Sequence, residues 1–184
     1  MLTAYRLTEK GLEEAAPQVG AEIPSSTAWI DLHQPTIGED RVAERFLGAE
    51  IPSREETEEI EFSSRFYAED GAVFMTASLL TGVERREPVL SPLTMVVAGD
   101  RIVTVRYDDL RAMRQFVTRA VKPGSGCGSA AAIFLGLLEA IIDRTADVLE
   151  RLSQDVARIN TDVFKRPAGD ISRLANSPSL VNSK

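Results

Sequence analysis

The 184-residue sequence has one cysteine and one histidine, and its apolar runs are all shorter than the roughly 18 residues of a transmembrane helix. Because Cys127 stands alone, no disulfide can form within the chain, which favours a reducing compartment. The first residues, MLTAYRLTEKGLEE, also lack the apolar core of a signal peptide. We therefore expect a cytoplasmic chain that neither enters nor crosses a membrane by itself.

The same scarcity limits the chemistry that the chain can perform. A Cys–His nucleophile would require Cys127 and His33, which are distant in the sequence, to meet in space. The Gly-rich segment KPGSGCGS (122–129) lacks the Lys-Ser/Thr ending of a phosphate-binding P-loop. We predict a loop in this segment, a packed or surface thiol at Cys127, and no enzymatic activity.

An excess of basic residues, which nucleic-acid-binding proteins use to contact phosphates, is also missing. The 28 acidic residues outnumber the 21 basic ones, and the formal net charge is −7. This balance excludes nucleic acid as a partner and suits a surface that attracts cations, although many proteins are acidic for solubility alone. A hydrophobic content of 43% is enough for one core with a long appended helix.

Alternating apolar and polar residues predict several strands. The segments LTAYRL and TAWIDL are two of them, and Trp29 in the second is a predicted core residue. Asp70-Gly71 predicts a hairpin turn between SRFYA and AVFMTASLL. Gly99-Asp100 predicts another, between strands that contain Val96 and Val103.

Two capping boxes predict the starts of two helices. Thr36 followed by Glu39 predicts a helix over roughly 37–47, and Ser53 followed by Glu56 predicts another immediately after it. The apolar spacing of DLRAMRQFVTRAV is also helical. From Ser129 to Phe164 there is no proline and one glycine, which indicates a single long helix.

These elements predict an α+β fold. We expect an α/β/α sandwich with a mixed, mostly antiparallel sheet, followed by a long C-terminal helix. The predicted organisation is an α/β domain over 1–127, a long helix that packs on it over 128–166, and a polar, frayed tail over 167–184.

An acidic segment, IPSREETEEIEFSSRFYAEDGAVFMT (51–76), places many carboxylates beside a strand that must be buried. Two interpretations remain open at this point: a solvated helix face, or a surface that meets a cation. The helix dipole already favours Glu55 and Glu56 in the first turn of a helix. On the long helix, Glu139 begins an acidic edge whose repulsion nearby arginines or a bound cation would offset.

Four segments occur in an order typical of one family: WIDLHQPT, LGAEIPSREETEEIEFSSRFYAEDGAVFMT, RIVTVRY and LLEAIIDRTADVLERL. Together, over residues 1 to about 166, they resemble the amino-terminal cytoplasmic domain of the CorA family of divalent-cation transporters. The resemblance implies a membrane protein that passes Mg²⁺, and often Co²⁺ or Ni²⁺, as a homopentamer. It also implies an α/β/α cytoplasmic domain, a very long stalk helix and two transmembrane helices, the first ending in Gly-Met-Asn.

The membrane part of that pattern is missing from this sequence. With no transmembrane helix and no Gly-Met-Asn, we expect an excised domain or a truncated product that cannot itself conduct ions. The full-length protein would lie at the cytoplasmic face of the bacterial inner membrane. The isolated domain is predicted to be monomeric or weakly associated, although exposed Val156 and Ile159 could drive a non-native dimer by helix packing.

In this family, acidic sites between subunits hold Mg²⁺, and their occupancy closes the pore. The best matches to those ligands are Glu55 and Glu56, with Glu139 on the long helix as a second acidic ligand. Weak, water-rich carboxylate sites suit Mg²⁺. Co²⁺ and Zn²⁺ are other candidate ions.

Two other functions remain open. The ZntB-type zinc transporters share the fold, but zinc prefers His or Cys ligands, and this chain offers only His33 and Cys127. A soluble metabolite-binding α/β domain would instead show a closed pocket with convergent polar groups.

Overall fold

The computed structural model describes residues 1–15, 23–59, 61, 64–83 and 87–165. Residues Met1–Thr145 form one compact unit, and the residues from Ala146 onward belong to a second. Within the described ranges, no helix is both long and apolar enough to span a membrane. The predicted polar tail, 167–184, lies outside the described residues, and the predicted domain boundary at 127 stays a prediction.

A seven-stranded sheet forms the centre of the first unit, with the order β2-β1-β3-β7-β6-β5-β4. The strands are β1 (Leu2–Thr8), β2 (Gly11–Ala15), β3 (Thr27–His33), β4 (Phe66–Glu69), β5 (Ala72–Thr81), β6 (Val89–Ala98) and β7 (Arg101–Arg106). All neighbouring strands are antiparallel except β3 and β7, which are parallel. The predicted mixed, mostly antiparallel sheet is confirmed.

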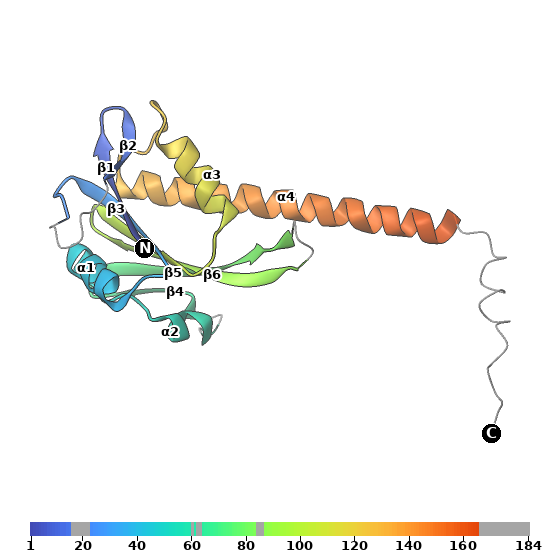
Figure 1. The fold of residues 1–184 in the computed structure, drawn as a ribbon, viewed down its shortest axis with the longest axis horizontal. Helices are drawn as coiled ribbons and strands as arrows, with labels where there is room; N and C mark the ends of the chain where they lie inside the picture. Colours follow the sequence, from blue (N-terminus) through green and yellow to red (C-terminus); the bar gives the residue numbers. More distant parts are fainter. Residues whose placement is uncertain (16–22, 60, 62–63, 84–86, 166–184) are drawn as a thin grey trace, which may run out of the picture. The chain divides into compact units, whose positions relative to one another are not determined.

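Helices cover both faces of this sheet (Figure 1). They are α1 (Ile37–Leu47), α2 (Arg54–Glu59), α3 (Arg111–Ala120) and α4 (Ala130–Lys165). Within the first unit, α1 and α2 lie on one face, and α3 and the first part of α4 lie on the other. This arrangement confirms the predicted α/β/α sandwich and the long helix after it.

The strand periodicity explains why there are two cores. Successive side chains of a strand point to opposite faces, so Trp29 of β3 packs with Phe116 of α3, whereas its neighbour Ile30 packs with Phe46 of α1. Trp29 is fully buried, as predicted, and its ring stacks on Tyr5 with 4.3 Å between centroids. Large aromatic side chains of this kind fix the position of α3 on the sheet.

The local signals in the sequence predicted most element boundaries. Both partners of the Thr36 capping box are in place, and α1 covers the predicted range. Asp70 and Gly71 adopt φ values of 49° and 80°, the left-handed pair that a tight hairpin turn requires.

Strand β2 carried no comparable signal in the sequence. Its residues, GLEEA, include a single apolar side chain larger than alanine, Leu12, which is buried. It lies at the edge of the sheet, paired only with β1. An edge strand needs few apolar residues, so the apolar pattern of β2 is too weak to predict a strand unless its pairing with β1 is known.

Candidate functional site

Helix α2 carries the acidic residues that the sequence singles out. The side chain of Glu56 accepts a hydrogen bond from the backbone N–H of Ser53 at 2.8 Å, and the Ser53 hydroxyl accepts one from the N–H of Glu56 at 3.2 Å. The bonds from the Ser53 backbone and side chain lower the pKa of Glu56. The predicted second capping box is confirmed, and one oxygen of Glu56, Oε2, is used by it.

The inner side of α2 contacts its own first turn and the segment that follows β7. Thr57 is buried and donates a hydrogen bond to the Ser53 carbonyl at 2.7 Å. The guanidinium of Arg54 lies 5.0 Å from the centre of the Tyr107 ring and pairs with Glu58 at 2.7 Å. These contacts leave the opposite side of a short helix directed to solvent.

Glu55 lies on that outer side. Its side chain is exposed, and among the described residues the structure gives it no hydrogen-bond or ion-pair partner. Glu50 and Glu61, on either side of α2, are exposed as well. The surface around α2 is therefore anionic, with Arg54 largely neutralised by Glu58.

Glu139 occupies a different surface. It belongs to the part of α4 that packs, with α3, on the other face of the sheet, and its side chain is 70% exposed. Nη2 of Arg119, on α3, lies 3.7 Å from its carboxylate. Glu55 and Glu56 are neighbours in the first turn of α2, whereas Glu139 lies on the other face of the sheet, away from both.

The described residues contain no group of three or more His, Cys, Asp or Glu side chains that could hold a metal ion. A carboxylate pair such as Glu55 and Glu56 can still supply one or two ligands to Mg²⁺, which keeps several waters when it binds proteins. The arrangement suits a weak, hydrated cation site rather than a closed metal centre.

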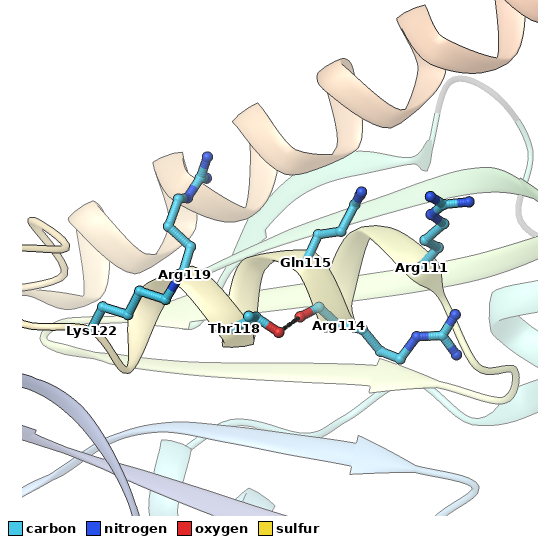
Figure 2. Close-up of a pocket in the computed structure, with 6 residues that line it drawn as sticks. All are labelled: Arg111, Arg114, Gln115, Thr118, Arg119 and Lys122. Carbon is cyan, nitrogen blue, oxygen red and sulfur yellow. Dashed lines mark hydrogen bonds between the residues drawn. The ribbon is translucent and has the colours of Figure 1, made fainter.

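The exposed side of α3 has the opposite charge (Figure 2). Arginine and lysine side chains dominate a shallow hollow along this helix, lined by Arg111, Arg114, Gln115, Thr118, Arg119 and Lys122. Arg119 also donates a hydrogen bond to the Gly136 carbonyl at 3.1 Å, which ties α3 to α4. A divalent cation is repelled from this side, and at Glu139 it would have to compete with Arg119.

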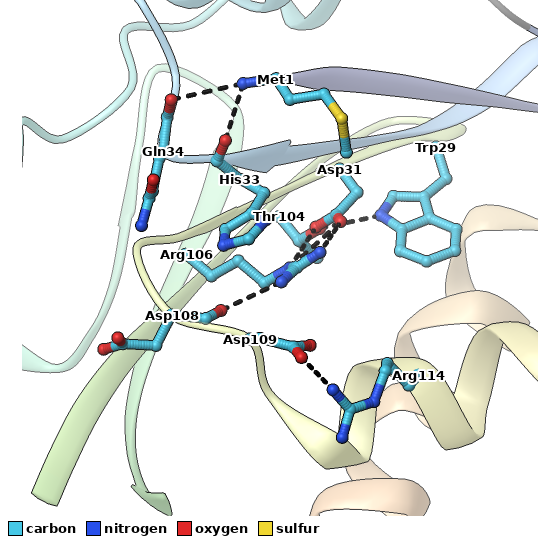
Figure 3. Close-up of polar contacts among 10 residues, drawn as sticks. All are labelled: Met1, Trp29, Asp31, His33, Gln34, Thr104, Arg106, Asp108, Asp109 and Arg114. Atoms are coloured by element: carbon cyan, nitrogen blue, oxygen red, sulfur yellow. Dashed lines mark hydrogen bonds and ion pairs between the residues drawn. The ribbon is translucent and has the colours of Figure 1, made fainter.

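The sheet contains a buried polar network that the sequence did not predict (Figure 3). The Thr104 hydroxyl accepts a hydrogen bond from Trp29 Nε1 at 3.0 Å and donates one to Asp31 Oδ1 at 2.7 Å. Arg106 donates to the other carboxylate oxygen of Asp31 through Nη2 at 2.9 Å and Nε at 3.1 Å. Asp31 inside the apolar segment TAWIDLH was the available signal, since a charge in a buried strand requires a partner.

The network holds the parallel pair β3 and β7 in register, because Asp31 lies opposite Thr104. Arg106 also donates to the carbonyl of Asp108 at 3.0 Å, which fixes the start of the segment between β7 and α3. The network lies on the same face of the sheet as Trp29, α3 and the first part of α4, and its charged side chains, Asp31 and Arg106, are buried.

Tyr5 gives this region a dependence on pH. Burial, and secondly the negative charge of Asp31, raise the pKa of Tyr5 from 10.0 to about 12. Above pH 10 the unfolded chain releases this proton while the folded chain keeps it, so the stability from a neutral Tyr5 is complete below pH 10 and is lost as pH rises to 12. The loss is about 2–3 kcal/mol. In urea unfolding between pH 10 and 12, we expect the free energy of unfolding of wild type to fall more than that of Tyr5→Phe. Parallel pH dependences of the two proteins would contradict this role of Tyr5.

The family model for "CorA-like Mg2+ transporter protein" matches residues 24–177. The magnesium transport protein CorA of Escherichia coli (strain K12) is 28% identical over 175 residues, which cover 92% of this chain and 54% of that protein. The chain therefore spans about half the length of this curated relative.

Two solved structures have the same fold. The complete CorA magnesium transporter from Methanocaldococcus jannaschii superposes with a TM-score of 0.62 at 12% identity, covering 89% of this chain and 51% of that one. The ZntB cytoplasmic domain from Vibrio parahaemolyticus RIMD 2210633 superposes with a TM-score of 0.53 at 16% identity, covering 81% and 62%. The family match extends over most of the sequence, includes α2 and most of the sheet, and agrees with the fold, so this chain belongs to the family of CorA-like Mg²⁺ transporter proteins.

Proposed function

We propose that this chain is the cytoplasmic, metal-sensing domain of a CorA-type transporter of Mg²⁺ and Co²⁺, and that the carboxylates of α2 bind the sensed cation. The name of the Escherichia coli relative, a magnesium transport protein, supports the ion, and the alignment covers nearly all of this chain. In the full-length protein, transmembrane helices would anchor the domain at the cytoplasmic face of the inner membrane.

The observation that carries the proposal is the unneutralised charge of α2. Glu55 has no cationic partner among the described residues, and Glu56 uses one carboxylate oxygen for the cap, which leaves Oε1 for a ligand. Carboxylates that repel one another are relieved by a hydrated divalent cation. The basic surface of α3 lies on the other face of the sheet, where it does not compete for this charge.

Glu139 enters the proposed site only from another copy of the chain. It lies on the opposite sheet face from α2, so the two acidic groups of one chain cannot share an ion. A ring of copies, the homopentamer that the family resemblance implies, would place unlike faces of neighbouring subunits together. In such a ring the carboxylate of Glu139 would leave Arg119 and bind the cation held by α2 of the neighbouring subunit.

A zinc-transporting, ZntB-type function is the second candidate, because the ZntB cytoplasmic domain shares the fold. Zinc prefers imidazole and thiolate ligands. The only cysteine, Cys127, is buried at 7% exposure, and the only histidine, His33, lies at the end of β3. Neither residue is on α2, and this favours Mg²⁺ or Co²⁺ over Zn²⁺.

Thermal unfolding in MgCl₂ tests the proposal. A cation that binds only the folded chain stabilises it by RT ln(1 + [L]/Kd), about 0.4 kcal/mol when free Mg²⁺ equals Kd. For a domain of this size we expect an increase of about 1–2 °C in Tm, growing with concentration up to about 20 mM, at constant ionic strength.

The variant Glu55→Gln/Glu56→Gln is expected to lose most of this response. Glutamine preserves the capping box at position 56, so the starting stability of α2 is largely retained. Glu9→Gln, in the exposed turn between β1 and β2, is the matched control and should respond like wild type. Equal Mg²⁺ responses in all three proteins would exclude α2 as the sensor.

A further inference from the structure

The exposed side of α3 carries positive charge without negative charge. Residues 111–122 include four basic side chains and no acidic one, in a chain whose formal net charge is −7. A helix face that only keeps a protein soluble commonly carries both signs, because like charges three or four residues apart repel each other. A face with charges of one sign attracts ligands of the opposite sign. The charge of α3 therefore favours an anionic ligand.

The α3 hollow, the shallow depression lined by these basic side chains, is bordered by two rows of residues. Residues four apart lie on the same side of a helix, which gives two sets of three. They are Arg111, Gln115 and Arg119 in the first row, and Arg114, Thr118 and Lys122 in the second. Figure 2 shows the first row extending to one side of the helix and Arg114 to the other. Each row has a cation at both ends, so two cationic pairs lie about 12 Å apart along the helix axis.

Carboxylates of the same chain hold two of these arginines loosely. Nη2 of Arg119 lies 3.7 Å from the Glu139 carboxylate, which is beyond hydrogen-bond distance. Arg114 pairs with Asp109, but both of these side chains are more than half exposed. Ion pairs this exposed contribute little to stability, because water solvates and screens both charges. An incoming anion can therefore replace both carboxylates at low cost.

The other donors of the α3 hollow suit phosphate. Within the described part of the chain, the Lys122 ammonium and the Gln115 amide have no hydrogen-bond or ion-pair partner. Guanidinium groups donate two parallel hydrogen bonds to phosphate oxygens, and an ammonium adds a point charge. The six lining residues include no aromatic or large apolar side chain, so a nucleobase or an acyl chain finds no surface to pack on among them.

We propose that the α3 hollow binds an oligophosphate anion, the phosphate chain of a free nucleotide or inorganic triphosphate, between its two cationic pairs. A compact anion fits the short span of one helix. An anionic bilayer would also press against Asp109 and Glu139, which flank the hollow, and would be repelled by both. The anion site is separate from the cation site proposed for α2, since the two helices lie on opposite faces of the sheet.

Titration with sodium tripolyphosphate, followed in ¹H–¹⁵N NMR spectra of the magnesium-free chain, tests the proposal. We expect saturable shifts of the amide signals of α3. ATP should bind with similar affinity, because recognition uses the phosphates, whereas AMP, with a single phosphate, should bind at least about tenfold more weakly. Added NaCl should weaken the binding of all three anions, since it screens exposed charges.

Gln115→Glu places a negative charge between the two cationic pairs. It should not disturb the helix, because Arg111 and Arg119 are each four residues away and can pair with the new carboxylate. This variant should bind tripolyphosphate at least about tenfold more weakly than wild type. Gln154→Glu is the matched control, because it makes the same substitution at an exposed position of α4 outside the hollow, and it should bind like wild type.

Glu55→Gln/Glu56→Gln should also bind tripolyphosphate like wild type, so a failure of the α2 cation site would leave this result unchanged. Tripolyphosphate that produces no saturable shifts at α3 would overturn the proposal. Equal affinities of Gln115→Glu and Gln154→Glu would show that the anion does not bind in the hollow. Sedimentation of the chain with vesicles of equal parts phosphatidylcholine and phosphatidylglycerol, without any binding of tripolyphosphate, would assign the basic side of α3 to a membrane surface instead.

Discussion

Replacement of Arg106 by methionine is expected to lower the free energy of unfolding by about 3–5 kcal/mol. The substitution leaves the Asp31 carboxylate, with a side chain only 6% exposed, without its cationic partner inside the sheet. Among the residues that the structure describes, only the Thr104 hydroxyl would still donate to it. Urea unfolding at neutral pH measures the loss.

The exposed pair Arg6–Glu13 provides the matched control. Its atoms are 2.9 Å apart, the same separation as in Arg106–Asp31, but the side chains are 46% and 55% exposed. Water solvates both charges, so Arg6→Met should cost at most about 1 kcal/mol. The double variant Asp31→Leu/Arg106→Met should recover much of the loss, because no charge is then left buried. Equal costs for Arg6→Met and Arg106→Met would contradict the role of burial.

The second large effect is expected at Phe116, which is 1% exposed. Its ring meets Trp29 edge-on at 5.5 Å between centroids and fills the space above Gly136 of α4. Phe116→Ala should therefore lower the free energy of unfolding by about 3–5 kcal/mol, through lost burial and an unfilled cavity.

Gly136 tests the same contact from the other side. A β-carbon at this position would lie 2.6 Å from Cε2 of Phe116. In wild type, the overpacking cost of Gly136→Ala, about 1–3 kcal/mol, should outweigh the gain of about 1 kcal/mol in helix propensity. In the Phe116→Ala background the clash is gone, and Gly136→Ala should stabilise the chain. Stabilisation in both backgrounds would show that the ring does not restrict this position.

The fold was predictable where its determinants are local. The capping pairs at Thr36 and Ser53 and the turn at Asp70-Gly71 each act over four residues or fewer, and all three are confirmed. By contrast, the parallel register that places Asp31 opposite Thr104 joins segments 73 residues apart, and no local pattern encodes it.

The candidate site was likewise predictable only in its local part. The exposure of Glu55 and the capping role of Glu56 follow from their places in the first turn of α2. The position of Glu139 on the opposite sheet face, and its approach to Arg119, depend on how α3 and α4 pack, which spacing along the helix does not reveal. For the same reason, the sequence did not predict that the acidic residues of α2 and the basic residues of α3 lie on opposite faces of the sheet.

The most direct test that α2 binds the sensed cation is to localise a paramagnetic divalent ion on the chain. Mn²⁺ takes the same carboxylate and water ligands as Mg²⁺ and broadens the NMR signals of nearby amides. In ¹H–¹⁵N spectra at substoichiometric Mn²⁺, we expect broadening that is centred on residues 53–59 and is relieved by excess Mg²⁺, while the amide signals of α3 stay sharp. Broadening centred elsewhere, or broadening at α2 that excess Mg²⁺ does not relieve, would contradict it.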